Sequence, residues 1–99
     1  MKIIKNKIDE LQYKIGHCGE IEIEDIKVMS ERKKGIGREM FNELLELNPK
    51  TVYAFTRKSN VVGRHFYKAL GFREIELPNF YSEEDAILVI SENSLYRKI

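Results

Sequence analysis

The chain has 99 residues, of which 42% are hydrophobic and 33% are charged, and its formal net charge is +1. This length allows one domain, so we expect residues 1–99 to form a single globular domain. The longest apolar run, residues 86–90, is far shorter than the roughly 20 residues of a membrane-spanning helix, which excludes such a helix. Because the charge is near zero, no long-range field draws the protein onto nucleic acid or anionic lipid.

The cysteine content and the N-terminal segment bear on the cellular compartment. Cys18 is the single cysteine, which excludes an internal disulfide and a cysteine-rich zinc site. Residues 1–5 continue into more charge rather than into an apolar segment, so we expect no secretory signal. A lone thiol suits a reducing compartment. We therefore expect a cytoplasmic protein without a bound metal.

The first predicted elements are two strands joined by a turn. Apolar and polar residues alternate over residues 11–15 and again from residue 21, and residues 16–19 between them begin and end with glycine. In the second strand the period of two slips by one residue between Ile23 and Ile26. Such a slip is typical of a β-bulge, a feature common beside active sites. The alternative is that Ile26 begins a segment buried on different contacts.

A helix and a strand follow. Apolar residues recur at helical spacing over residues 35–47, with polar residues between them, which predicts an amphipathic helix. Asn48 and Pro49 end it, because the residue before a proline disfavours the helical conformation. Residues 51–56 are rich in β-branched and aromatic side chains and indicate a buried strand.

The C-terminal half contains a second helix and two more strands. Asn60 can cap this helix, and Gly71 ends it. The side of the helix predicted to be apolar carries Val62, Phe66, Ala69 and Leu70. Residues 72–77 and 86–90 predict strands separated by a loop around Pro78. The element order β-β-α-β-α-β-β predicts a mixed α/β (α+β) fold, in which two helices flank a mixed β-sheet.

A basic, glycine-containing segment lies between a predicted strand and the first predicted helix. Gly35 and Gly37 let a ligand approach the backbone, and the helix start supplies unpaired N–H groups and the positive end of the dipole. Four cations cluster at this end: Arg32, Lys33, Lys34 and Arg38. Because helix N-termini ordinarily favour acidic residues, the cluster indicates a phosphate or pyrophosphate site. The alternative is a solvated basic loop.

Two motifs resemble those of a known family. Residues 32–37, Arg-Lys-Lys-Gly-Ile-Gly, lack the third glycine of a dinucleotide fingerprint, where Met40 stands, and the Gly-Lys-Ser/Thr ending of a nucleoside triphosphate loop. They resemble the Arg/Gln-x-x-Gly-x-Gly/Ala signature of the GNAT family of N-acetyltransferases. Residues 60–72 resemble that family's second motif, Asn-x-x-Ala-x-x-aromatic-Tyr-x-x-x-Gly-Phe, with Gly63 in place of the alanine. The resemblance covers residues 20–91.

This resemblance implies acetyl-coenzyme A as the acetyl donor and no metal. In the family the pantetheine arm inserts beside the bulged strand, so the backbone of Ile26, Lys27 and Val28 would pair with its amides. A backbone N–H near Val28 would polarise the thioester carbonyl. The implied contacts to the pyrophosphate and its neighbouring groups come from Arg32, Lys33, Lys34, Gly35, Ile36, Gly37, Arg38 and Asn60.

The resemblance also implies catalytic residues. Tyr67 stands at the tyrosine that commonly protonates the departing coenzyme A thiolate and contacts the cofactor, and a phenol stays protonated at neutral pH. The alternative for Tyr67 is core packing with a satisfied hydroxyl. Glu24 and then Glu22 are the candidate bases, because related enzymes carry histidines implicated in proton removal at these strand positions. The alternatives are a water chain and, for an exposed carboxylate, simple solvation.

The implied function is direct acetyl transfer to a primary amine of an unidentified protein or small molecule. An alternative is a non-catalytic coenzyme A-binding or protein-interaction module with the same fold. A third possibility is a nucleic-acid binder that also uses Arg57, Lys58 and Arg64, but the even charge balance argues against it.

The N-terminal part is expected to be short for this family, whose members usually begin with another strand and two helices. Here only residues 1–20 precede the bulged strand. We therefore expect an intact cofactor half and a reduced acceptor half. Either the acceptor is large or exposed, or a second subunit covers the bare sheet surface in a homodimer.

Overall fold

The computed structural model describes residues 2–6, 9–27, 35–81 and 84–98. In chain order the elements are β1 (Lys2–Asn6), β2 (Asp9–Ile15), β3 (Ile21–Lys27), α1 (Ile36–Leu45), β4 (Thr51–Arg57), α2 (Val61–Ala69), β5 (Arg73–Tyr81) and β6 (Glu84–Glu92). The strands hydrogen-bond in the order β1-β2-β3-β4-β6-β5. The predicted mixed fold of one sheet and two helices is confirmed. Neither described helix is long and apolar enough to cross a bilayer.

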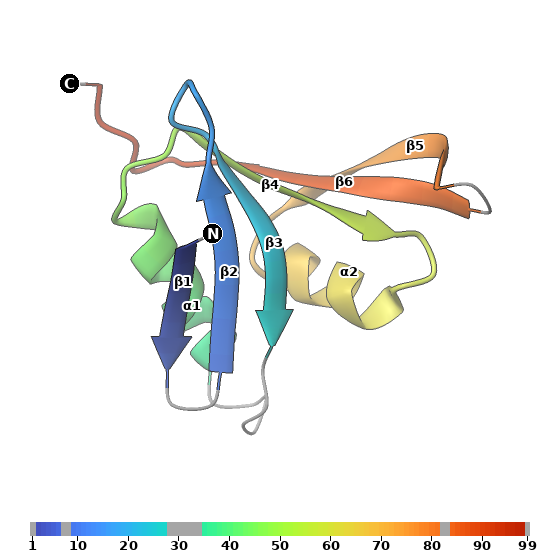
Figure 1. Ribbon diagram of the computed structural model, residues 1–99, viewed down its shortest axis with the longest axis horizontal. Coiled ribbons are helices and arrows are strands. Elements are labelled where there is room, and N and C mark those ends of the chain that lie inside the picture. The colour runs from blue at the N-terminus through green and yellow to red at the C-terminus, as the bar shows by residue number, and fades with distance from the viewer. Residues whose placement is uncertain (1, 7–8, 28–34, 82–83, 99) are drawn as a thin grey trace. The chain divides into compact units, whose positions relative to one another are not determined.

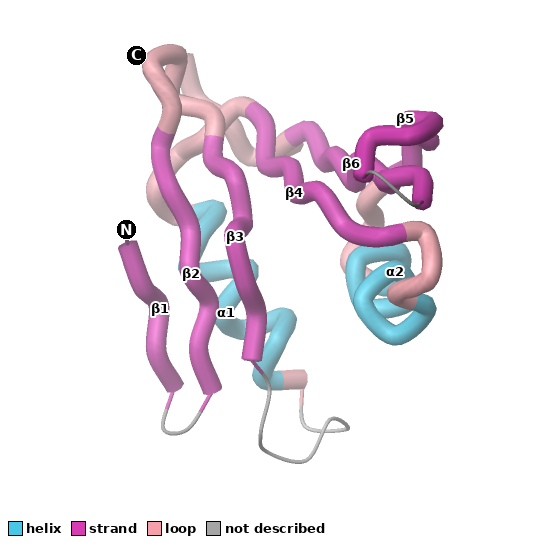
Figure 2. The backbone as a smooth tube through the Cα atoms, turned by 45° about the vertical axis from the view of Figure 1, so that its right-hand side comes forward, coloured by secondary structure: helices cyan, strands magenta, loops and turns pink. Residues whose placement is uncertain are grey.

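The chain divides into two compact units, and the first consists of Met1–Val52 and Glu92–Ile99. In this unit α1 lies against one face of the strands β1, β2 and β3 (Figure 1 and Figure 2). The apolar stripe that predicted the helix is the side it buries, because only that side excludes water from the sheet. The buried hydrophobic residues here include Leu11, Tyr13, Ile21, Ile23, Met40, Phe41 and Leu44.

The strand β1 is an element that the sequence did not predict, so the predicted order lacked its first strand. It pairs antiparallel with β2, and Ile4 lies opposite Leu11. Its two adjacent isoleucines break the alternation that marks a strand, and Ile3 remains 47% exposed. Pairing with β2, rather than local pattern, therefore gives this segment its structure.

The predicted bulge in β3 is confirmed. Gln12 of β2 pairs with Asp25, whereas the next residue, Tyr13, pairs with Ile23. Glu24 is therefore the extra residue of β3, without a counterpart on β2. The bulge explains why the apolar positions of the strand slip by one, since each side of it follows its own alternation.

The end of α1 is fixed by contacts with the C-terminal segment. The helix stops at Leu45, two residues before its predicted end, and Asn48 follows with a φ of 59°. The Asn48 carboxamide donates to the Arg97 carbonyl at 2.8 Å and accepts from the Arg97 N–H at 2.9 Å. The buried Asn93 donates to the Pro49 carbonyl at 2.7 Å. These long-range bonds hold the C-terminal segment against the turn that follows α1.

The second unit is Tyr53–Ser91, in which α2 lies against one face of β4, β5 and β6 (Figure 1). Its buried residues include Ala54, Thr56, Tyr67, Phe72, Ala86, Ile87 and Val89. The buried strand predicted over residues 51–56 is buried on one face only, since Ala54 and Thr56 are buried whereas Phe55 is 38% exposed. Its ring stacks on that of Phe80, which is 53% exposed, with centroids 5.3 Å apart.

Two further expectations for this unit need correction. The predicted apolar side of α2 is not its buried side, since Val62 is 58% exposed and Tyr67 is the buried residue of the helix. The loop expected at Pro78 is an irregularity within β5, where pairing with β6 shifts between Leu77 and Tyr81 and Asn79 has a φ of 53°. Because β5 pairs with β6 on both sides of Pro78, the strand continues through this residue.

Candidate functional site

The first unit contributes the N-terminal end of α1. Gly35 is the N-cap residue, and its φ of 70° lies in the left-handed region that favours glycine. A Cβ there would meet no atom of residues 2–6, 9–27, 35–81 or 84–98 within 4 Å, and its positive φ strains any other side chain, so backbone conformation selects glycine. No side chain among the described residues caps this helix end, and the N–H groups of an uncapped first turn favour an anion.

The charged residues of this segment are only partly placed. Val28, Arg32, Lys33 and Lys34 lie outside the described residues. Arg38 lies in the first turn of α1 and is exposed, next to Glu39. The backbone of Ile36 and the buried Gly37 form the same turn. The structure thus brings together the two glycines and one of the four predicted cations.

The two candidate bases on β3 have different surroundings. The half-buried Glu22 carboxylate forms an ion pair with Lys14, Oε1 to Nζ at 3.4 Å. Glu24 is the extra residue of the bulge and is exposed. Beyond the bulge, Ile26 pairs with Leu11 of β2, and Lys27 pairs with Glu10. The bulge therefore removes Glu24 from the regular alternation that Glu22 follows.

The second unit contributes Asn60, at the junction of β4 and α2. Its Oδ1 accepts a hydrogen bond from the Gly63 N–H at 3.1 Å, so the predicted helix cap is confirmed. Its Nδ2 donates to Thr56 Oγ1 at 2.9 Å. Sequence reasoning missed Thr56, although a buried-strand threonine four residues before the cap was the available signal.

Tyr67 lies on the buried side of α2 and is 8% exposed. Its ring centroid is 5.5 Å from that of Phe66 and 5.2 Å from that of Phe72. The ring therefore contributes to the core of the second unit, as the packing alternative expected.

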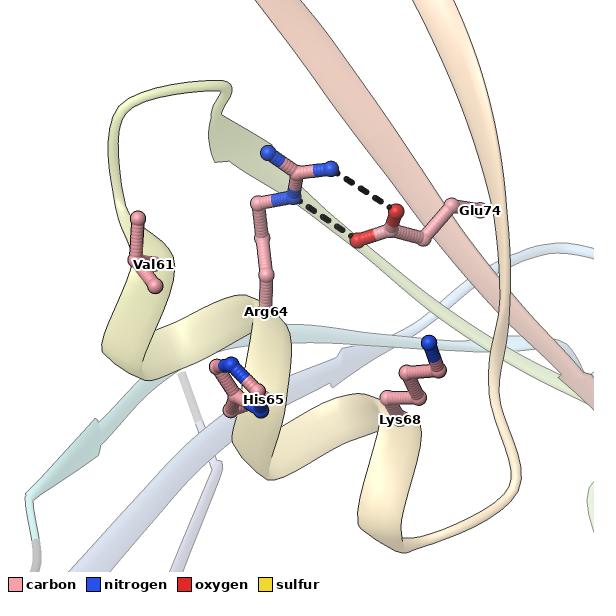
Figure 3. Close-up of a pocket in the computed structure, with 5 residues that line it drawn as sticks. All are labelled: Val61, Arg64, His65, Lys68 and Glu74. Atoms are coloured by element: carbon pink, nitrogen blue, oxygen red, sulfur yellow. Dashed lines mark hydrogen bonds and ion pairs between the residues drawn. The ribbon is translucent and has the colours of Figure 1, made fainter.

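A surface pocket of about 220 Å³ lies on another side of α2. It is lined by Val61, Arg64, His65, Lys68 and Glu74 (Figure 3). Arg64 is held there by two 2.9 Å bonds to the Glu74 carboxylate, from Nε and Nη2. Val61, His65 and Lys68 lie about 100° or more around α2 from Tyr67, whereas Arg64 follows Asn60 by one turn and Glu74 belongs to β5. The pocket therefore opens mainly on a different side of the helix from Tyr67.

Three basic residues of the second unit are paired with acids. Arg57 pairs with Glu84 at 3.1 Å, and Lys58 pairs with Glu76 at 2.7 Å. Arg64 pairs with Glu74, as described above. Because their charges are balanced within the chain, these cations are poorly suited to hold a phosphate backbone. This finding counts against the nucleic-acid interpretation.

The Arg64–Glu74 pair gives a pH-dependent prediction. Hydrogen bonds from Arg64 hold the pKa of the Glu74 carboxyl below its usual value of 4.5, and the nearby charges of Lys68 and His65 act in the same direction. The pair therefore stabilises the protein above that pH and is lost as the pH falls through the lowered pKa. We expect Glu74→Gln to cost at most about 1 kcal/mol of unfolding free energy at pH 7 and less at pH 3.

Urea unfolding at both pH values measures this effect. In an Arg64→Gln background the same substitution should change the unfolding free energy little at either pH. An equal cost at both pH values in the otherwise unchanged protein would contradict the prediction.

Comparison with known proteins adds to this geometry. The model of the acetyltransferase (GNAT) family matches residues 11–72. The chain is similar to Ard1 from Thermoplasma volcanium, with 26% identity, a TM-score of 0.69, and coverage of 85% of this chain and 62% of that one. It is also similar to the ribosomal-protein-S18-alanine N-acetyltransferase from Escherichia coli, with 25% identity and a TM-score of 0.69. That match covers 91% of this chain and 64% of the other.

A third structure, a GNAT family acetyltransferase from Elizabethkingia anophelis, has acetyl-CoA bound. It is 20% identical, with a TM-score of 0.70 and coverage of 86% of this chain and 68% of that one, and shows likeness of fold. The chain thus spans less than two thirds of the length of the first two relatives. No curated protein sequence matches it.

Proposed function

The chain belongs to the GNAT acetyltransferase family, and we propose that it transfers an acetyl group from acetyl-coenzyme A directly to a primary amine. The observation that supports this proposal is the N-terminal end of α1, where Gly35 is left-handed and no side chain in the described part of the chain caps the helix. This end lies inside the matched residues, 11–72. A helix N-terminus fits the pyrophosphate of the cofactor, because its first-turn N–H groups and dipole favour an anion.

The residues around this end would hold the cofactor. The first-turn N–H groups of Ile36 and Gly37 would donate to pyrophosphate oxygens, and exposed Arg38 would add a positive charge. Ile26 and Lys27, beyond the bulge, would offer backbone groups to the pantetheine amides. When bound, acetyl-coenzyme A supplies an activated thioester. The residues of the chain would orient that thioester, donate a proton to the departing sulfur and accept a proton from the amine.

We assign the two proton transfers to Tyr67 and Glu24. The amine nitrogen bonds to the thioester carbonyl carbon, the carbon–sulfur bond breaks, and the Tyr67 hydroxyl donates its proton to the departing sulfur. The amine's proton passes to Glu24, directly or through water. We prefer Glu24 to Glu22 as the base, because the Glu22 carboxylate already forms an ion pair with Lys14.

A protein amine is the acceptor class that we propose. By its name, the relative from Escherichia coli acts on an alanine of ribosomal protein S18. An exposed Glu24 is accessible to a docked polypeptide as well as to a small amine. The second candidate function is non-catalytic coenzyme A binding. It is distinguished by turnover, since only an enzyme releases free thiol when an amine peptide is added.

Thermal unfolding with and without acetyl-coenzyme A tests cofactor binding. Ligand at 100 times its dissociation constant should add about 2.7 kcal/mol, which raises the midpoint by about 10 °C or more. Gly35→Glu should abolish this shift, because it adds strain and negative charge at the anion site. Gly19→Glu is the matched control, since Gly19 also has a positive φ, 79°, and open space around it.

Two outcomes contradict the proposal. The absence of a shift at millimolar acetyl-coenzyme A would exclude a cofactor site. A shift that survives Gly35→Glu but is lost in Gly19→Glu would place the ligand elsewhere. If the shift is present but no amine peptide releases thiol, the non-catalytic candidate is favoured.

A further inference from the structure

The carboxamide of Asn60 is held on two sides in the second unit. Oδ1 accepts from the Gly63 N–H at 3.1 Å, and Nδ2 donates to Thr56 Oγ1 at 2.9 Å. The Asn60 backbone is fixed as well, since its N–H donates to the Arg57 carbonyl at 2.9 Å and its carbonyl accepts from the Arg64 N–H at 3.0 Å. Asn60 is thus an exposed residue whose amide plane has a set orientation.

Thr56 is the buried partner in this arrangement. It is 7% exposed, and it lies near the end of β4. A hydrogen bond to a buried hydroxyl competes little with water, so it constrains Asn60 more than a surface contact would. A carboxamide has two N–H groups and two acceptor lone pairs. The bonds to Thr56 and Gly63 use one N–H and one lone pair of the Asn60 carboxamide, so its second N–H and second lone pair can bind a ligand.

Gly63 provides the space for this orientation. A Cβ at position 63 would stand 2.5 Å from Asn60 Nδ2 and 3.0 Å from its Cγ. Alanine, which the family motif has at this position, would force the carboxamide to move. Glycine ordinarily destabilises a helix by up to about 1 kcal/mol relative to alanine, so its presence in the first turn of α2 needs a compensating reason.

We propose that Thr56 is a positioning residue, which together with Gly63 orients the Asn60 carboxamide toward bound acetyl-coenzyme A. The inference rests on the proposed function for the presence of the cofactor. Thr56 touches no cofactor atom in this assignment, and it acts through Asn60. The free N–H and lone pair of the carboxamide then meet the amide or phosphate groups of the cofactor in one orientation.

Titration calorimetry with acetyl-coenzyme A tests the proposal in the full chain. Thr56→Val keeps the shape and removes the acceptor, and we expect it to weaken binding about tenfold, or about 1.4 kcal/mol. Thr56→Ser keeps the hydroxyl and should bind within about twofold of the unchanged protein. Gly63→Ala should weaken binding although it favours the helix. Urea unfolding of each variant shows that the fold is retained.

A double variant of Thr56 and Asn60 tests whether Thr56 affects binding through Asn60 or only through the stability of the fold. Once Asn60→Ala has removed the carboxamide, Thr56→Val should have no further effect on affinity. Equal affinity of Thr56→Val and the unchanged protein would overturn the proposal, as would additive losses in the double variant. The Asn60 side-chain NH₂ signals in NMR give a readout without cofactor, and they should change in Thr56→Val but not in Thr56→Ser.

These readouts keep the two proposals distinguishable. If the unchanged protein does not bind acetyl-coenzyme A, the proposed function fails, and the cofactor part of this inference fails with it. If it binds and the NMR signals do not respond to Thr56→Val, only the positioning role is overturned.

Discussion

Replacement of Tyr67 by phenylalanine is expected to lower the rate of acetyl transfer by about 100-fold or more, the contribution typical of a positioned general acid. The ring contacts with Phe66 and Phe72 do not need the hydroxyl, so packing should be retained. Affinity for acetyl-coenzyme A should change little, because the proton is transferred only as the carbon–sulfur bond breaks. Thiol release with an amine peptide measures the rate.

Tyr13→Phe is the matched control for this prediction. Tyr13 is also buried, at 7% exposure, but it lies on β2 in the first unit. Its substitution should leave turnover unchanged. If Tyr67→Phe turns over at the normal rate, the tyrosine belongs to the core alone, and the proton of the leaving group must come from water.

Replacement of Leu44 by alanine is expected to destabilise the protein by about 2–5 kcal/mol, because it leaves a cavity under α1. Leu44 is fully buried between this helix and the sheet of the first unit, together with Met40 and Phe41. In a domain of this length such a loss lowers the unfolding midpoint by about 10 °C or more. Urea and thermal unfolding both report it.

Leu47→Ala is the control, since Leu47 follows α1 and is 50% exposed. Removing this side chain should change the unfolding free energy by no more than about 0.5 kcal/mol. Similar losses for both variants would mean that the stripe assigned to the core is wrong. An added acetyl-coenzyme A concentration well above its dissociation constant should partly restore the midpoint of Leu44→Ala.

The candidate site could be predicted in part. Local signals identified Gly35 at the start of α1, Asn60 at the start of α2, and the bulge of β3, because each depends on residues within a few positions of one another. The bulge could be recognised because only one face of the strand is buried, so one extra residue shifts the alternation of apolar and polar residues by one position. The surroundings of these residues could not be predicted. Thr56 accepts a hydrogen bond from Asn60 because the end of β4 lies next to the start of α2 in the folded chain.

The sequence by itself determined the mixed fold, most of its elements and the family, since periodicity, helix caps and motif spacing are local properties of the chain. The tertiary structure alone decided the strand β1, the exposed face of β4 and the binding of Asn48 to Arg97. It also decided that Arg57, Lys58 and Arg64 pair with acids of β5 and β6. The physical reason is the same in each case: strand pairing, burial and ion pairs depend on residues that meet only after folding.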